Sequence, residues 1–340
     1  MSSYGQRRRL DRERMKLSIA LSTRDGEAHL AEQLAAIEGQ TRQPDELIVV
    51  DGGSTDATPQ IVTRFAERVG FTVDLHRGED VETSANFARA IALCTGDHIA
   101  LGDQRDPWMA ERLAAGERAL IDQPDAMLAF SDAHLITESG FPLPGRVWQA
   151  VGFGRQELRT MRCDPLAAML RRPPVTGCTI TFRREVAEIA LPFPPGMALE
   201  HDTWLALCAA AVGSIAPLAT PLAACRVGIC RAVASALGRA GSGRFRRRSG
   251  GEPDEVADRR PPAVRDQAAL LQIRLEQRGG GSPEVLRTLE DFADFCDFRT
   301  ALPRWPARPA AVVRRVRSGD YHRFGDGWRG ALGDLVRRRI

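Results

Sequence analysis

Short apolar runs alternate with segments of helical spacing along the first 131 residues, and this alternation limits the fold more than any other feature of the sequence. The apolar runs predict strands, and they lie at residues 16–23, 46–51, 71–76, 98–101 and 127–131. Strands that alternate with helices of this length form βαβ units, which build a mainly parallel sheet. We therefore expect an α/β fold with a mainly parallel sheet flanked by helices.

Aspartates recur where these predicted strands end. Asp51 ends the second strand, Asp103 and Asp106 follow the fourth, and Asp132 follows the fifth. Open α/β sheets bind ligands at the carboxyl ends of their strands, where acidic side chains suit a ribose, a base or a divalent cation held against a diphosphate. Taken singly, each aspartate is more typical of a turn or a helix cap. Their recurrence at successive strand ends favours a ligand site.

Seven segments stand in an order that is specific to one group of enzymes. They are LSIALSTRDG (17–26), QTRQPDELIVVDGGSTDAT (40–58), NFARAIALCTGDHIALGDQRDPW (86–108), FSD (130–132), VTGCTITF (175–182), EHDTW (200–204) and GDYHRFGDGWRGALGDL (319–335). Their order resembles that of the family 2 glycosyltransferases, which are inverting enzymes of GT-A fold. Within that family the chain is most similar to a bacterial rhamnosyltransferase-like branch. The resemblance extends over almost the whole chain.

The resemblance implies a GT-A fold with a helical C-terminal extension, and it implies a reaction. A sugar would move, with inversion, from a nucleoside-diphosphate sugar to a hydroxyl of a glycan or polyprenyl-linked acceptor in cell-surface polysaccharide assembly. This chemistry needs a base for the incoming hydroxyl and positive charge for the leaving diphosphate. The family also leads us to expect Mg²⁺ or Mn²⁺ as cofactor.

The resemblance assigns roles to individual residues. Asp202 matches the base, and His201 beside it would orient Asp202 or bind the diphosphate. Asp103 and Asp106 match the positions that hold the metal. Donor recognition falls on four positions, which are Thr23, Asp51, Asn86 and Asp103.

The sequence departs from the family pattern at three places. Gly52 replaces the second aspartate of a strand-end pair, and Arg105 replaces the principal metal carboxylate. After Arg226 the usual histidine is missing. These changes leave two alternatives open: an active enzyme in which Arg105 clamps the donor diphosphate without metal, or a noncatalytic homologue that binds sugar nucleotide or partner enzymes. A sugar nucleotidyltransferase is a less favoured third reading, because the loop after the first strand is short and has a single arginine.

Charge is unevenly distributed over a chain whose net charge is only +3. Residues 301–340 hold ten arginines and three aspartates, which makes this segment +7. A basic segment of this kind predicts either contact with an anionic membrane surface or a solvated helical face. No nucleic-acid-binding module is recognisable, so we expect no nucleic-acid partner.

The cysteines and the lack of an apolar leader bear on the compartment. The seven cysteines form no CxxC pair, which favours single thiols in a reducing environment. No apolar export segment follows the basic residues 1–15, so we expect a cytoplasmic protein, peripheral on the inner face of the cell membrane.

Composition also predicts how the chain is divided. The expected parts are a basic arm (1–15), a GT-A domain (16–235) with nucleotide-sugar (16–132) and acceptor (133–235) halves, a flexible linker or lid (236–262), and a basic helical extension (263–340). Trp148 lies in a Gly- and Pro-containing stretch and is equally typical of an acceptor-covering loop and of a packed core.

Overall fold

The computed structural model describes residues 15–78, 83–194, 200–227 and 260–336. Nearly all of the predicted basic arm and residues 236–259 of the predicted linker therefore lie outside the described residues. One mixed sheet runs through the described chain, with strand order β3-β2-β1-β4-β7-β5-β6 and with β8 paired to β5. The strands are β1 (Leu17–Thr23), β2 (Glu46–Asp51), β3 (Thr72–Arg77), β4 (His98–Asp103), β5 (Ala126–Ile136), β6 (Pro142–Arg146), β7 (Ile180–Arg183) and β8 (Ser214–Arg226).

The first four strands form a parallel half-sheet, as the alternation predicts. β1 pairs in parallel with β2 and β4, and β3 pairs in parallel with β2. Every residue of β1 and β2 is buried, which is typical of strands covered on both faces. The register places Thr23 opposite Asp51 and Ser22 opposite Asp103. The predicted donor residues therefore meet at one edge of the sheet.

The second half of the sheet is mixed. β7 runs antiparallel to both β4 and β5, whereas β8 runs parallel to β5. The prediction that Asp132 follows the fifth strand was wrong, because β5 continues to Ile136. Asp132 is buried within β5, where its Oδ1 accepts hydrogen bonds from the backbone nitrogens of Ala133 (2.8 Å) and Trp148 (3.0 Å). It therefore shapes the acceptor half of the sheet instead of a strand end.

Two segments next to the strands have irregular structure. Residues 175–182 contain a 3₁₀ turn, η1 (Gly177–Thr179), which is followed by the short β7. The helix that follows β4 begins only at Arg112. The reason is that residues 107–109 are held against β8, through hydrogen bonds from Met109 N to Leu222 O and from Ala224 N to Pro107 O.

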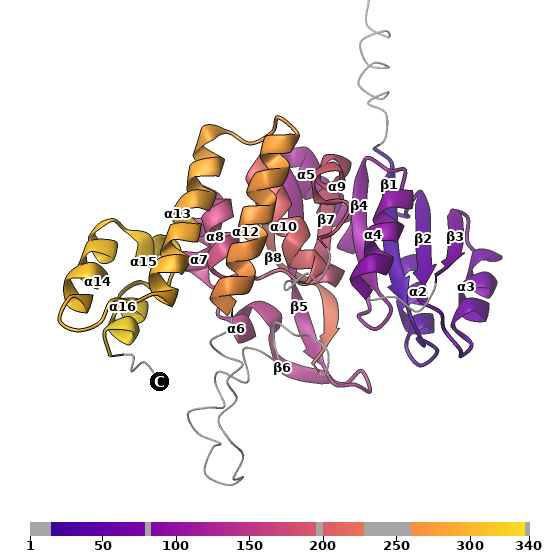
Figure 1. Ribbon diagram of the computed structural model, residues 1–340. Coiled ribbons are helices and arrows are strands. Elements are labelled where there is room, and N and C mark those ends of the chain that lie inside the picture. Colours follow the sequence, from indigo (N-terminus) through magenta and orange to yellow (C-terminus); the bar gives the residue numbers. More distant parts are fainter. Residues whose placement is uncertain (1–14, 79–82, 195–199, 228–259, 337–340) are drawn as a thin grey trace, which may run out of the picture.

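Helices cover the sheet and continue beyond it (Figure 1). Those of the sheet domain are α2 (Leu30–Glu38), α3 (Thr58–Ala66), α4 (Thr83–Leu93), α5 (Arg112–Asp122), α6 (Val147–Val151), α7 (Arg155–Cys163), α8 (Pro165–Arg171), α9 (Arg184–Ala190) and α10 (His201–Val212). α4 packs on β1 and β2, and α10 packs on β5, α8 and α9. The apolar stretch after Trp204 is a buried helix followed by a strand.

Trp148 belongs to the core. It lies in α6 with 5% of its surface exposed, and its ring is 4.8 Å from that of Phe153 and 5.4 Å from that of Phe130. The alternative in which Trp148 stacks on an acceptor sugar is therefore wrong.

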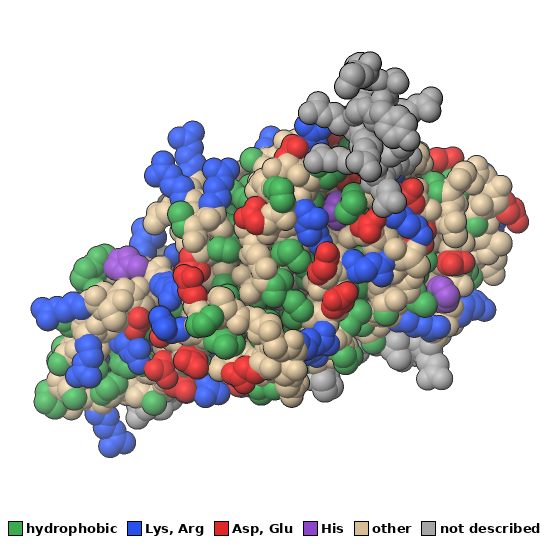
Figure 2. All heavy atoms as spheres, turned by 90° about the horizontal axis from the view of Figure 1, so that it is seen from above, with side chains coloured by type: hydrophobic (Ala, Val, Ile, Leu, Met, Phe, Trp, Pro, Cys, Tyr) green, Lys and Arg blue, Asp and Glu red, His purple; other side chains and the backbone are tan. Residues whose placement is uncertain are grey.

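The C-terminal helices extend the molecule away from the parallel half-sheet. They are α12 (Arg260–Gln277), α13 (Pro283–Thr300), α14 (Arg308–Arg317), α15 (Asp320–Arg323) and α16 (Gly327–Val336). α12 and α13 pack against each other, and α13 contacts α8. Figure 2 shows Lys and Arg side chains projecting around the end of the molecule that α14 and α16 form. In the part of the chain that the structure describes, no helix combines the length and apolar character needed to cross a bilayer.

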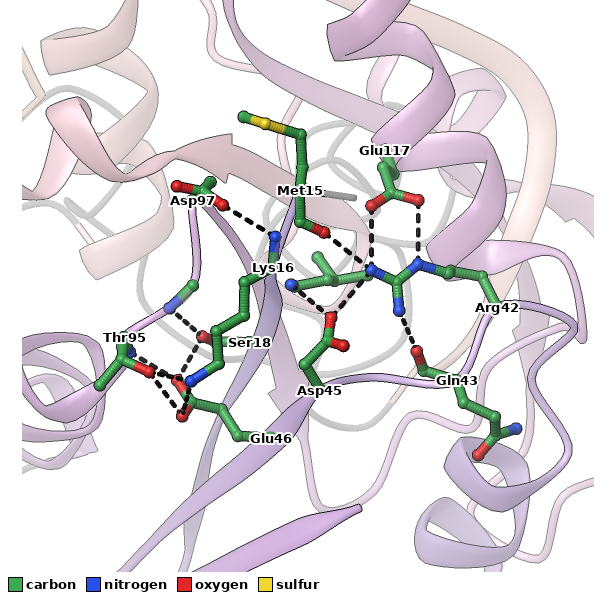
Figure 3. Close-up of polar contacts among 12 residues, drawn as sticks. Met15, Lys16, Ser18, Arg42, Gln43, Asp45, Glu46, Thr95, Asp97 and Glu117 are labelled. Carbon is green, nitrogen blue, oxygen red and sulfur yellow. Dashed lines mark hydrogen bonds and ion pairs between the residues drawn. The ribbon is translucent and has the colours of Figure 1, made fainter. Parts of the chain in front are cut away.

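Polar side chains at the amino ends of the strands form a closely hydrogen-bonded network (Figure 3). Glu46 accepts from Ser18 Oγ (2.5 Å), Thr95 N (2.5 Å), Thr95 Oγ1 (2.8 Å) and Lys16 Nζ (3.0 Å). Beside it, Arg42 donates to both carboxylate oxygens of Glu117, at 3.0 and 3.1 Å. The only lysine of the chain therefore has a structural position.

Candidate active site

The carboxyl ends of β1 and β2 are joined by a buried carboxylate. Asp51 accepts hydrogen bonds from Thr23 Oγ1 (3.1 Å), from Ser54 N (3.0 Å) and from Ser54 Oγ. Its side chain is completely buried. Asp51 thus fixes the glycine turn that follows β2 and holds Thr23 beside it.

The side chain of Asn86 lies over position 52 and explains why a glycine stands there. A Cβ atom at Gly52 would stand 2.5 Å from Nδ2 of Asn86, a distance that real Cβ atoms do not adopt. Asn86 is buried in α4 and also lies against Gly78. A Cβ atom added to Gly78 would be 3.5 Å from Asn86 Oδ1. The Asn86 amide therefore fills space next to β2 that a second aspartate side chain would need.

The turn after β4 carries Asp103, Arg105 and Asp106. Asp103 Oδ1 accepts a hydrogen bond from Arg105 N at 2.9 Å. The Arg105 guanidinium is ion-paired with Glu138, which also contacts His29 Nε2 at 3.0 Å. Burial raises the pKa of Asp103, and the nearby positive charges and the Arg105 amide offset only part of that effect.

Arg226 forms hydrogen bonds that connect this turn to other segments of the chain. This role was not predicted from the sequence. Arg226 is almost fully buried at the end of β8. Its backbone nitrogen donates to Asp106 Oδ1 at 2.9 Å, its Nε donates to Glu138 O at 3.1 Å, and its guanidinium also bonds Glu32 (2.7 Å) and Arg105 O. An arginine at the end of a long apolar run was the sequence signal that could have singled out this residue, whereas its partners have no such signal.

Asp106 points away from solvent toward Arg226. Its Oδ2 accepts from the Cys225 thiol at 3.7 Å, and Cys178 also bonds its side chain. Burial and then the charge of Asp103 raise the pKa of Asp106 to about 7. Its two oxygens are thus directed at Arg226 N and at the thiols.

The first turn of α10 places His201 and Asp202 beside the same edge. The His201 ring stacks on Phe87 with centroids 4.1 Å apart, and within the described chain its buried Nδ1 has no hydrogen-bond partner. Burial lowers the pKa of His201 to about 4, so the ring is neutral at pH 7. Since Phe87 follows Asn86 in α4, this stacking joins the α10 end of the site to the glycine turn.

Asp202 is a carboxylate with a raised pKa in the first turn of α10. Its Oδ1 accepts from Thr203 N at 2.6 Å, and the backbone of Gly177 also bonds the carboxylate. Burial raises the pKa of Asp202 to about 6, because these hydrogen bonds offset only part of the cost of desolvation. A carboxylate with this pKa is mostly ionised at pH 7 and binds a proton more readily than an ordinary aspartate.

Asp103 and His201 fit a divalent cation. Each affects the pKa of the other through its charge, so the two groups are near neighbours. His201 is neutral and its Nδ1 is orphaned, while Asp103 offers a carboxylate oxygen. An oxygen and an imidazole nitrogen are ligands that Mn²⁺ accepts, whereas the Arg105 guanidinium beside them is held by Glu138.

The family follows from a comparison of sequences. The model of the family described as Glycosyl transferase family 2 matches residues 18–185, which include the strand-end turns just described. This domain belongs to glycosyl transferase family 2. The match thus extends from β1 into α9, and the remaining described chain supplies α10, β8 and the C-terminal helices.

Solved structures show that the fold is that of GT-A glycosyltransferases. Residues 1–349 of TarS from S. aureus superpose with a TM-score of 0.53 at 14% identity, over 95% of this chain and 80% of that chain. The mannosyltransferase PcManGT from Pyrobaculum calidifontis superposes with a TM-score of 0.50 at 19% identity, over 98% and 92% of the two chains. Both likenesses extend into the C-terminal helices.

Curated relatives match a shorter part of the chain. An uncharacterised protein of Mycobacterium bovis is 28% identical over 127 residues, which are 36% of this chain and 37% of that protein. A PGL/p-HBAD biosynthesis glycosyltransferase of Mycobacterium bovis is 32% identical over 116 residues, or 34% and 45% of the two chains. The chain therefore matches less than half the length of these curated relatives.

Proposed function

We propose that the protein is an inverting glycosyltransferase that moves a sugar from a nucleoside-diphosphate sugar to a hydroxyl of a glycan or polyprenyl-linked acceptor. The carrying observation is that Asp202, whose pKa is raised to about 6, directly follows His201, and that His201 interacts with Asp103 at the end of β4. Structures of TarS with UDP and of PcManGT with GDP-Man and Mn²⁺ support a nucleotide-sugar donor. The rhamnosyltransferase-like branch and a role in cell-surface polysaccharide assembly stay predictions.

Each site residue then has a role in one displacement. Thr23, Asp51 and Asn86 shape the donor side of the site. Asp202 removes the proton from the acceptor hydroxyl as its oxygen attacks the anomeric carbon, and the bond to the diphosphate breaks on the opposite face. The proton ends on the Asp202 carboxylate, and the anomeric configuration is inverted without a covalent enzyme intermediate.

The leaving diphosphate needs positive charge. A divalent cation held by Asp103 and His201 would supply that charge when bound. Arg105 donates to Glu138 in this structure, which supports the metal-assisted alternative. Asp106 is directed toward Arg226 and two thiols, so we assign it no part in binding the donor metal.

A transfer assay tests the proposal. Purified protein is incubated with a panel of sugar nucleotides and candidate lipid-linked acceptors, with Mn²⁺ or with EDTA. We expect transfer that needs metal; transfer that persists in EDTA would instead support the Arg105 clamp. Binding of sugar nucleotide without any transfer would support the noncatalytic homologue. Release of pyrophosphate from a nucleoside triphosphate and a sugar phosphate would indicate a nucleotidyltransferase.

We also propose that the C-terminal helices hold the protein on an anionic membrane surface at the inner face of the cell membrane. Three exposed apolar residues lie at every fourth position of α16: Trp328 (63% exposed), Leu332 (59%) and Val336 (77%). The last turn of α14 carries three arginines. Apolar insertion combined with basic charge is the pattern of peripheral attachment to anionic lipid.

Vesicle co-sedimentation tests this attachment. The protein should bind vesicles of phosphatidylglycerol and phosphatidylcholine, and binding should fall when phosphatidylglycerol is omitted or salt is raised. The double variant Trp328→Ser, Leu332→Ser should bind weakly. Ile121→Ser is the matched control, because Ile121 is exposed on α5, far along the chain from α16. Equal binding by all three proteins would contradict the proposal.

A further inference from the structure

Three metal-binding side chains meet behind the turn that carries Asp103, and the transfer mechanism does not use them. They are Asp106, Cys178 and Cys225, which come from the turn after β4, from η1 and from β8. One ligand atom of each lies within 4.8 Å of the others. Both thiols are almost completely buried. The chain thus brings a carboxylate and two sulfurs together from positions far apart in the sequence.

We propose that these three residues form a zinc site, separate from the cation position at Asp103 and His201. In a tetrahedral zinc site, with Zn–S about 2.3 Å and Zn–O about 2.0 Å, a sulfur and an oxygen ligand are about 3.5 Å apart. Cys225 Sγ and Asp106 Oδ2 are 3.7 Å apart, so small side-chain rotations complete that geometry. Two sulfur ligands select zinc over magnesium or calcium, and solvent would fill the fourth position.

A buried positive charge next to Cys178 supports thiolate ligands. The Arg112 guanidinium is fully buried and donates to Cys178 O (3.2 Å), Ile180 O (2.6 Å) and Thr181 Oγ1 (2.7 Å), which are all neutral. Among the described residues no carboxylate pairs with it. A zinc ion with two thiolates and one carboxylate has a charge of −1, which balances Arg112. The metal site therefore gives this buried arginine a counter-charge.

The site would position the catalytic groups. Asp106 lies on the same turn as Asp103, and Cys178 follows Gly177, whose backbone bonds the Asp202 carboxylate. Cys225 precedes Arg226, which bonds Glu138 and Arg105. Zinc would hold the three segments together, so its ligands are positioning residues. This inference does not depend on which sugar is transferred.

Cobalt substitution distinguishes this site from the donor-metal position. Protein purified under reducing, anaerobic conditions is stripped with a chelator and titrated with Co²⁺. Thiolate ligands give an intense near-ultraviolet sulfur-to-cobalt absorption, which oxygen and nitrogen ligands do not give. We expect this band to saturate near one equivalent of Co²⁺ and to disappear when Zn²⁺ is added.

Variants then assign the band. The double variant Cys178→Ser, Cys225→Ser should lose it, whereas Asp103→Asn should retain it. Cys94→Ser is the matched control, because Cys94 is a buried thiol outside the cluster. If the double variant does not fold, Asp106→Asn should weaken Co²⁺ binding at least tenfold. Cobalt binding without the thiolate band, an unchanged band in the double variant, or a Cys178–Cys225 disulfide in the anaerobic protein would overturn the proposal.

Discussion

Buried carboxylates at the two ends of the parallel half-sheet have pKa values that are shifted in opposite directions. At the amino ends, burial alone would raise the pKa of Glu46, but hydrogen bonds from Ser18, Thr95 and Lys16 outweigh it and lower the pKa to about 2. At the carboxyl ends, burial prevails and raises the pKa of Asp202 to about 6 and that of Asp106 to about 7. The kind of donor contributes to the difference, because Glu46 accepts from the charged Lys16 ammonium whereas Asp202 accepts only from neutral groups.

This contrast separates structural polar groups from functional ones. The amino-end network satisfies its own charges and leaves little for a ligand to bind. The carboxyl end leaves the His201 Nδ1 without a partner in the described chain and gives Asp202 only neutral hydrogen-bond donors. Incomplete satisfaction costs stability, and it is typical of sites whose partners arrive with the substrate.

The largest effect should come from removing the base at the carboxyl end. Asp202→Asn keeps the size of the side chain but cannot accept a proton in the same way, so we expect kcat to fall about 10³-fold. Donor affinity, measured by isothermal titration calorimetry, should stay within threefold. Asp164→Asn is the control, because Asp164 is the N-cap residue of α8. This substitution should leave kcat nearly unchanged. A fully active Asp202→Asn variant would remove Asp202 from the mechanism.

A second effect concerns the fit between Gly52 and Asn86. Gly52→Asp places a side chain 2.5 Å from the Asn86 amide, so Asn86 must move and we expect donor KM to rise at least tenfold. Adding Asn86→Ala should relieve the clash and restore the melting temperature that Gly52→Asp lowers. Additive effects of the two substitutions would show that these residues do not interact.

A substitution in the amino-end network should change the free energy of unfolding and leave catalysis unchanged. Glu46→Gln removes a charged acceptor of four hydrogen bonds, and we expect it to lower the free energy of unfolding by about 2 kcal/mol with donor KM unchanged. Urea unfolding measures the loss. Glu67→Gln provides an exposed control on the same half of the molecule. A change in KM without a loss of stability would reverse the contrast between the two ends.

The smallest effect is the pH dependence of stability. The pKa of Glu46 is lowered, so its contribution is present above pH 4.5 and is lost as the pH falls toward 2. The pKa of Asp202 is raised, so the folded state holds a proton that the unfolded state releases, and this contribution to stability is lost as the pH rises from about 4 to 6. The lowered pKa of His201 adds stability over the same range, so the test is a difference: the urea midpoint of Asp202→Asn relative to the parent protein should rise between pH 4 and 6.

Local sequence patterns predicted the parts of the fold that depend on local order. β2 begins and ends where its apolar residues indicate, and β1 begins within one residue of its prediction. The predicted strand ends also placed Thr23, Asp51 and Asp103 at the same end of the sheet. The prediction for Asp132 was wrong because a distant segment decides it: β5 continues past Asp132, where β8 pairs with its far end.

The same distinction applies to the site. The motif order indicated Asp103, His201 and Asp202, because those residues stand in recognisable strings. Two other features depend on contacts between segments far apart in the sequence. They are the position of the Asn86 amide over Gly52 and the hydrogen bonds of Arg226 to the turn after β4. Such contacts have no local signal in a single sequence.

The pH dependence of kcat/KM for sugar transfer tests the central claim most directly. If Asp202 of the free enzyme is the base, kcat/KM should rise tenfold per pH unit below about pH 6 and level off above it. The profile should be taken with saturating Mn²⁺ and with the donor found in the panel. A rate that is independent of pH from 5 to 8, or no transfer from any sugar nucleotide, would contradict the account.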